Sequence, residues 1–225
     1  MSVYNQIFAI LLLVALVSCF AKLGLKEYYA KLMAIYLLWL ICTFVASVYV
    51  VRGLGIINNL FLFHLSTPID YAVLALLYHG VMISTMVKRW IVVSIPAYIL
   101  LSIYLSLFVQ PIDENNTYSI IFGSTLLICW SLFFLREVLL YRPAMRLLRY
   151  PMFWISVGIL FYYTGSLLIE SMLNFMIRQD MPLARRLYRI VYVFKYLLMV
   201  LIIIGAFCQT IFRDQATLKY KSGNV

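Results

Sequence analysis

The sequence predicts an all-α integral membrane protein, a bundle of seven transmembrane helices. Hydrophobic residues make up 65% of the chain and charged residues only 12%, and the mean hydropathy is +1.00, whereas about 25% of the residues in soluble domains are charged. The apolar runs are about twenty residues long, which suits a helix that crosses a bilayer, and they lack the alternation of a membrane β-barrel. Because lipid cannot pair with backbone polar groups, helices are the structure that remains.

Seven spans account for nearly the whole chain. Aromatic residues at the span ends, such as Trp90, Tyr118 and Trp154, are typical anchors at the bilayer surface. No basic segment precedes the first span, so we expect a retained helix rather than a cleaved signal peptide. We expect a transmembrane domain over residues 1–212 and a short basic cytoplasmic tail over residues 213–225, with no room for a soluble domain. In chain order, the spans are expected near residues 4–22, 32–51, 69–87, 90–109, 118–140, 152–174 and 189–211.

Basic residues in the loops predict the orientation, because Lys and Arg concentrate on the cytoplasmic side. Twelve of them flank the spans on the side of the C-terminal tail, against five on the side of the N-terminus. We therefore expect the N-terminus outside and the C-terminus in the cytoplasm, in a bacterial inner membrane. Four of the five contrary cations lie in the sixth connection: Arg178, Arg185, Arg186 and Arg189. This exception indicates either a functional site or simple pairing with lipid headgroups.

Composition also excludes several classes of protein. The net charge is +10, but the basic residues are scattered between apolar spans as membrane flanks are, so we expect no nucleic-acid partner. The four cysteines lie within spans, without the spacing of a disulfide framework or a zinc site. We therefore expect no metal and no cofactor.

Ionisable residues within spans are the best pointers to function, because each is costly in a bilayer unless it is paired or hydrated. His64 and Asp70 lie at the expected outer entrance of the third span, Glu170 lies toward the outer end of the sixth, and Lys195 lies in the outer half of the seventh. One interpretation is a polar cavity that opens to the outside. The other is snorkelling to the interface together with one or two salt bridges between helices.

The sixth span carries two different features on neighbouring faces. Tyr163, Ser166 and Glu170 share one face at helical spacing, and a carboxylate beside hydroxyls could bind a cation, a proton or a polar ligand. Gly158 and Gly165 lie on the neighbouring face. We expect these glycines to allow close packing against another helix, as small residues do in membranes.

Hydroxyl groups follow one stripe on each of the third and fourth spans. The stripes consist of Tyr71, Tyr78 and Thr85, and of Ser94, Tyr98, Ser102 and Ser106. We expect them to hold helices together through hydrogen bonds, which average about 0.6 kcal/mol in a bilayer. A conduction path remains the alternative interpretation.

Two segments carry a family resemblance, GIINNLFLFHLSTPIDYAVLALLYH and PMFWISVGILFYYTGSLL. They resemble uncharacterised seven-span bacterial membrane proteins, notably from Bacteroidota. The resemblance implies a seven-helix fold and, for some relatives, sensory input to signalling proteins beside them or fused to them. Asp70 stands where such relatives tend to carry Glu. The residues that carry the resemblance are Asn58, Asn59, His64, Pro68, Asp70, Tyr78, Pro151, Phe153, Trp154, Gly158, Tyr162 and Gly165.

The preferred functional hypothesis is a non-enzymatic sensor or receptor-like module that binds a small polar or anionic ligand in an outward-facing cavity. The expected ligand-binding residues are Asn59, His64, Asp70, Tyr163, Glu170 and Arg185. The response would pass to a protein partner through a basic cytoplasmic loop at Arg142, Arg146 and Arg149 or through the C-terminal tail. Homo-oligomers are compatible with this hypothesis. A pore or transporter, such as a triggered membrane effector, is the second hypothesis. A lipid-modifying enzyme working at His64 and Glu170 is the third, although no recognisable catalytic motif supports it.

Overall fold

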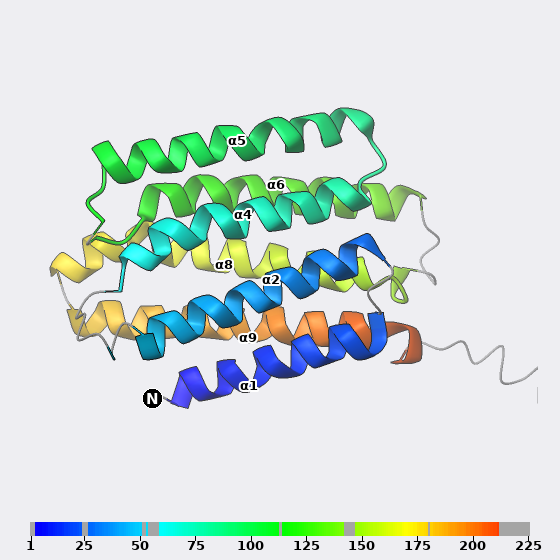
Figure 1. Cartoon of the computed structure of the whole chain (residues 1–225), viewed down its shortest axis with the longest axis horizontal. Coiled ribbons are helices and arrows are strands. Elements are labelled where there is room, and N and C mark those ends of the chain that lie inside the picture. Colours follow the sequence, from blue (N-terminus) through cyan, green and yellow to red (C-terminus); the bar gives the residue numbers. More distant parts are fainter. Residues whose placement is uncertain are drawn as a thin grey trace, which may run out of the picture.

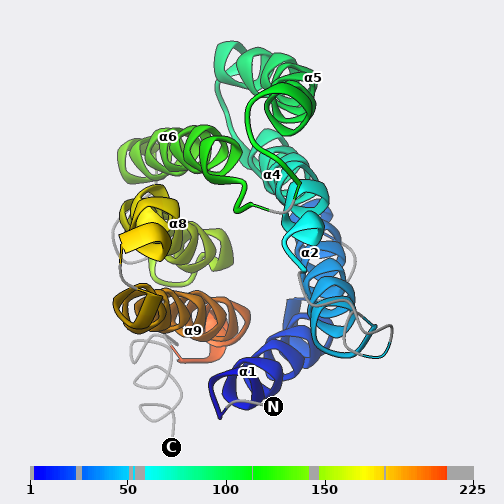
Figure 2. The same ribbon diagram turned by 90° about the vertical axis from the view of Figure 1, so that its left-hand side faces the viewer.

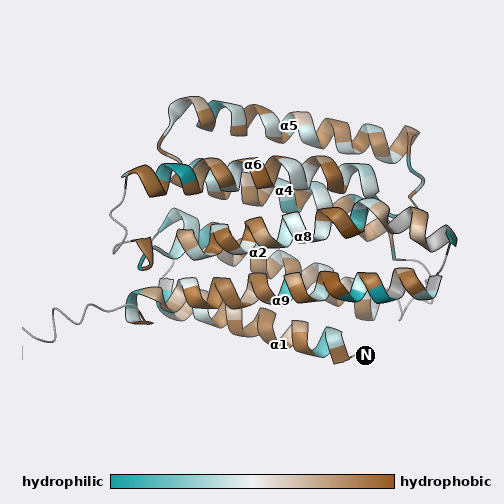
Figure 3. Cartoon of the chain, turned by 180° about the vertical axis from the view of Figure 1, so that it is seen from behind, coloured by the Kyte–Doolittle hydropathy of each residue, from teal (hydrophilic) through white to brown (hydrophobic). Residues whose placement is uncertain are grey.

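The computed structural model describes residues 3–23, 27–50, 53, 59–112, 114–141, 147–179 and 181–211. Within these residues the chain is all-helical and contains no strand, which confirms the predicted class. Seven of the described helices are long and apolar enough to cross a membrane (Figure 1). Hydrophobic residues cover most of the length of the helices, interrupted by scattered hydrophilic ones (Figure 3).

The seven helices run back and forth along one direction (Figure 1). The third begins at Phe61 and the seventh at Met181, each eight residues before the expected start of its span. These first turns contain polar residues, so hydropathy misses them while the backbone hydrogen bonds continue. In chain order the helices are α1 (Val3–Ser18), α2 (Tyr28–Val45), α4 (Phe61–Val81), α5 (Thr85–Phe108), α6 (Thr117–Tyr141), α8 (Pro151–Gln179) and α9 (Met181–Ile211), with π-helical turns η1 (Cys19–Leu23) after α1 and η2 (Ala46–Val50) after α2.

Six of the helices form a ring, and α5 lies outside it (Figure 2). In the end-on view, α4, α2 and α1 make one row and α6, α8 and α9 the other (Figure 2). Contacts of α1 with α9 and of α4 with α6 join the two rows, and α5 packs on α4 and α6. We call the end of the bundle at which α1 begins the N-terminal end, and the opposite end, where α9 finishes, the C-terminal end.

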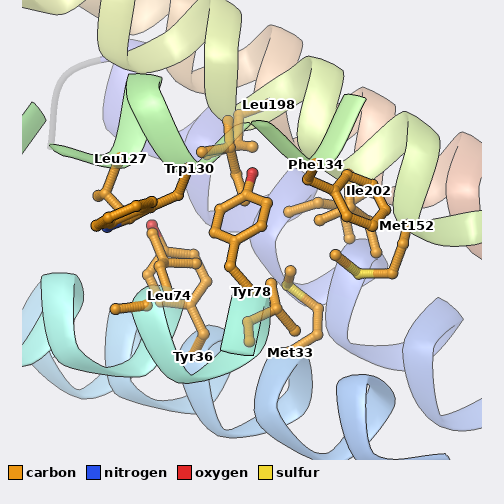
Figure 4. Packing of buried hydrophobic residues seen from close by; sticks show 14 of the residues in the cluster. Met33, Tyr36, Leu74, Tyr78, Leu127, Trp130, Phe134, Met152, Leu198 and Ile202 are labelled. Carbon is orange, nitrogen blue, oxygen red and sulfur yellow. The ribbon is translucent and has the colours of Figure 1, made fainter. Parts of the chain in front are cut away.

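The half of the bundle toward the C-terminal end is closely packed. Tyr78 on α4 is fully buried there among Met33, Phe134 and Met152 (Figure 4). Its hydroxyl forms a 2.7 Å hydrogen bond with Ser131 on α6. The apolar side chains that surround this group fill the space between the two rows at the level of Tyr78.

Close approach of α8 and α9 depends on the two glycines of the sixth span. A Cβ atom at Gly158 would lie 3.1 Å from Leu198 and 3.2 Å from Leu201, and one at Gly165 would overlap the ring of Phe194. All three contacts are made by α9. The prediction that Gly158 and Gly165 serve helix packing is therefore confirmed.

The hydroxyl stripes of α4 and α5 form hydrogen bonds between helices, as predicted. Tyr71 on α4 is 2.6 Å from the hydroxyl of Ser94 on α5. Tyr98 on α5 donates to the backbone carbonyl of Ser119 on α6 at 2.8 Å. Ser102 reaches the Ser119 hydroxyl at 2.8 Å. These hydrogen bonds attach α5 to the ring. The hydroxyl groups that form them are therefore already paired with protein groups.

Candidate functional site

A cavity of about 220 Å³ lies inside the ring, in the half toward the N-terminal end. Every one of the seven helices contributes to its wall, and α5 does so only through Tyr98. Its polar lining consists of Asn5, Tyr36, Thr43, Ser47, Ser66, Thr67, Asp70, Tyr71, Tyr98, Ser124, Tyr162, Tyr163, Ser166, Glu170, Tyr188, Tyr192 and Lys195. The interior of the bundle is thus closely packed around Tyr78 and hollow and polar in the half toward the N-terminal end.

Three charged side chains from three helices face this cavity: Asp70 of α4, Glu170 of α8 and Lys195 of α9. Side chains lean toward the N-terminus of their helix, so Lys195 on α9 leans toward the N-terminal end. Lys195 interacts electrostatically with both carboxylates. Among the described residues, however, no direct ion pair joins it to either one. The three charges therefore face one another across the cavity rather than in contact.

The carboxylate of Asp70 lacks a partner of good geometry. The indole of Trp39 lies beside it, but Asp70 Oδ1 and Trp39 Nε1 are both buried without a hydrogen bond. Buried polar atoms are almost always paired in proteins, and an unpaired one costs about 1–3 kcal/mol. Asp70 thus lines the cavity and carries one buried acceptor oxygen that has no donor.

Glu170, by contrast, is held by a loop. The Nδ2 atom of Asn115, between α5 and α6, donates to Glu170 Oε2 at 3.3 Å. Gln110 tightens this loop, because its side chain donates to the Asn115 carbonyl at 3.2 Å and accepts from the backbone N–H of Tyr118 at 3.0 Å. The loop therefore covers Glu170 at the N-terminal end and fixes the direction of its carboxylate.

Asn115-Asn116-Thr117 also matches the sequon for N-glycosylation. All three residues are buried, with Asn115 6% and Asn116 0% exposed. In this fold the segment packs against the bundle, so its side chains are not presented to a glycosyltransferase.

Tyrosine side chains complete the wall around the two carboxylates. The side chains of Tyr36 and Tyr163 interact with each other, and both interact electrostatically with Asp70. Tyr188 does the same with Glu170. Phenolic hydroxyls can donate to a carboxylate or accept from a ligand. The wall can therefore serve both donors and acceptors around a bound molecule.

Three of the six residues predicted to bind a ligand lie in the cavity wall: Asp70, Tyr163 and Glu170. Asn59 lies beside it and donates to Ser47, a wall residue, at 2.6 Å. Arg185 lies in α9, and its side chain is outside what the structure describes.

His64 does not face the cavity. Its Nδ1 atom is 2.8 Å from the hydroxyl of Ser106 on α5, and its Nε2 atom is 3.0 Å from the backbone carbonyl of Glu114. Because a carbonyl can only accept, Nε2 carries the proton in this bond. His64 thus joins α4 to α5 and to the loop that covers Glu170, which is a positioning role.

Of the three basic residues expected to contact a partner, the structure describes one. Arg142 and Arg146 are outside the described residues, whereas Arg149 is described and half-buried. Arg149 contributes to an open groove together with Glu27, Tyr28 and Gln209. Among the described residues, no group of three or more His, Cys, Asp or Glu side chains gathers.

The ligand-binding prediction missed Lys195 and several tyrosines of the wall. Tyr188, Tyr192 and Lys195 follow one another at steps of four and three residues, so they share one face of α9. This spacing indicates a polar face of α9 and could have been used to predict these residues. No such pattern marks Tyr36, because α2 has apolar residues on all sides.

Comparison with known proteins leaves the site to be interpreted from its own geometry. No protein family, curated protein or solved structure matches the chain. Function is therefore inferred from the cavity, its charges and its unpaired groups.

Proposed function

We propose that this protein is a receptor-like membrane module, which binds a small polar ligand in the cavity and passes the signal to a partner protein. The observation that carries the proposal is the set of Asp70, Glu170 and Lys195, which face one cavity without a direct ion pair among the described residues. Charges inside a membrane bundle are costly unless they are compensated. A polar ligand that bridges them would supply this compensation.

The proposed direction of signalling follows from the arrangement of the bundle. The predicted orientation places the cavity toward the outside and the groove beside Arg149 toward the cytoplasm. Helices α4, α8 and α9 line the cavity and continue into the packed half. A ligand that draws Asp70, Glu170 and Lys195 together would shift these helices relative to one another, and a partner at the opposite end would sense the shift.

Two observations favour this proposal over its rivals. A pore or transporter needs polar groups that are free to line a path, whereas the hydroxyls of Tyr71, Tyr98 and Ser102 are engaged in bonds between helices. A lipid-modifying enzyme would use His64 with Glu170, but both ring nitrogens of His64 are engaged elsewhere. A non-enzymatic binding role suits the geometry best.

Ligand binding can be tested with the purified chain in lipid nanodiscs. A panel of amines, amino acids, sugars and carboxylic acids is screened for an increase in the unfolding temperature, since a ligand that binds only the folded state stabilises it. We expect at least one class of compound to stabilise the wild type, and Glu170→Gln to reduce the effect. Glu27→Gln is the matched control, because Glu27 is an exposed carboxylate at the opposite end of the bundle.

Two results would overturn the receptor assignment. One is a panel in which no class of compound stabilises the wild type. The other is ion flux through liposomes that contain the chain alone, which would favour the pore.

A further inference from the structure

The charge of the cavity wall points to the class of ligand. Two carboxylates, Asp70 and Glu170, face one ammonium group, that of Lys195, so the described wall has a formal charge of minus one. An uncompensated charge is costly in a low-dielectric interior. A ligand with one positive charge makes the occupied cavity neutral, whereas an anion would leave it with two negative charges.

The aromatic wall favours an organic cation over a metal ion. Lys195 already places its ammonium group 5.9 Å from the centre of the Phe8 ring and 5.5 Å from that of Tyr192. Rings at these distances attract a cation through their negative faces. The rings of Phe44, Tyr36 and Tyr163 also line the cavity. The resident ammonium thus shows how the wall can receive a second one.

We infer that the ligand is a small organic monocation, a protonated amine, whose N–H groups bind the carboxylate of Asp70 while its carbon skeleton lies against the tyrosine and phenylalanine rings. Glu170, held by Asn115, supplies the second negative charge. Lys195 competes with the ligand for both carboxylates. This inference rests on the proposed receptor function and narrows the ligand class from polar molecules in general to amines.

Four compounds that share a phenyl ring and are similar in size separate the effect of charge from that of shape. They are benzylamine, a cation; benzyl alcohol, which is neutral; benzoate, an anion; and phenylglycine, a zwitterion. Binding of each to the purified chain in nanodiscs is measured by calorimetry near neutral pH. We expect benzylamine to bind at least tenfold more tightly than each of the other three.

Substitutions in the wall assign the effect to its charges. We expect Asp70→Asn to weaken benzylamine binding about tenfold or more, and Glu170→Gln to weaken it less. Lys195→Met should strengthen it, because the competing ammonium is gone; a merely structural role of Lys195 predicts no such gain. Glu27→Gln serves as the exposed control carboxylate, and the unfolding temperature of each variant reports its folding. If Asp70→Asn fails to fold, Glu170→Gln and Lys195→Met still test the inference through their opposite effects.

The possible failures are distinguishable. Equal binding of benzyl alcohol and benzylamine would overturn the inference about charge. Tighter binding of phenylglycine would replace the monocation by a zwitterion, and tighter binding of benzoate would replace it by an anion; both leave the receptor function standing. If none of the four compounds binds, the inference that the ligand is an amine is overturned. The proposed receptor function is overturned as well only if no compound of the broader panel stabilises the wild type.

Discussion

Adding one methyl group at Gly123 on α6 should destabilise the bundle through the hydrogen bonds of Tyr98. A Cβ atom at Gly123 would lie 2.5 Å from the Tyr98 hydroxyl, while Tyr98 is 1% exposed and bonded to Ser119. Overpacking costs about 1–3 kcal/mol, and the lost bonds cost about 0.6 kcal/mol each. The helix propensity of Ala returns about 0.5–1 kcal/mol. The net expectation for Gly123→Ala is a loss of roughly 1–3 kcal/mol.

Gly80→Ala is the matched control on α4. A Cβ atom there would overlap the ring of Tyr28, but Tyr28 is 50% exposed and its ring can swing away. We expect no loss of stability for this variant. Removing the hydroxyl with Tyr98→Phe should cost less in the Gly123→Ala background than in the wild type, by about 1 kcal/mol. Reversible unfolding by SDS in mixed micelles measures all four variants. Equal effects of the two alanine substitutions would refute the reasoning.

Two further predictions concern polar groups at opposite ends of the bundle. Glu137 on α6 accepts from the backbone N–H groups of Ile83 and Ser84 at 2.8 and 3.0 Å, so Glu137→Gln should cost about 1.5–3 kcal/mol through the loss of one charge-assisted bond. The neighbouring exposed residue provides the control, Arg136→Gln, and a similar cost for both in the SDS titration would contradict this account. Asn115 should stay unmodified when the chain is expressed in a eukaryotic host, because the sequon is buried; a shift in gel mobility after glycosidase treatment would show otherwise.

The sequence was sufficient for the class of fold because the bilayer constrains backbone so strongly. Apolar runs of about twenty residues leave few alternatives to helices. It was also sufficient for local packing devices, such as Gly165, since small residues at helical spacing have one common use in membranes. The first turns of α4 and α9 were missed because hydropathy indicates which residues face the lipid interior. The limits of a helix are set instead by its backbone hydrogen bonds, which extend into the polar segment before each span.

The site was predictable only in part, and the physical reason is the uniform apolarity of the helices. Asp70 and Glu170 were found because charge within a span is rare. Tyr36 was not, because a span that is apolar on every side does not reveal which face turns inward. His64 was assigned to the site because of its expected depth in the membrane, yet its ring is bonded to Ser106 and Glu114 instead. The depth of a residue in the membrane follows from its position in the sequence, whereas the direction of its side chain depends on the neighbouring helices.

One variant can test whether the charged residues of the cavity serve ligand binding or the stability of the bundle. Hydroxyl pairs such as Tyr78 with Ser131 and glycine contacts such as that of Gly165 hold the helices together without them. Replacing a complete buried set of charges by hydrophobic residues of similar volume is often neutral or stabilising, whereas removing one member leaves the others uncompensated. Asn, Gln and Met keep the volume of the three side chains and remove all three charges together. The triple variant Asp70→Asn, Glu170→Gln and Lys195→Met should therefore unfold at a free energy no lower than that of the wild type, and yet lose benzylamine binding. A triple variant with a far lower free energy of unfolding than each single variant would show that the three charges serve structure instead. Only in that case would the losses of stability from the three substitutions add up.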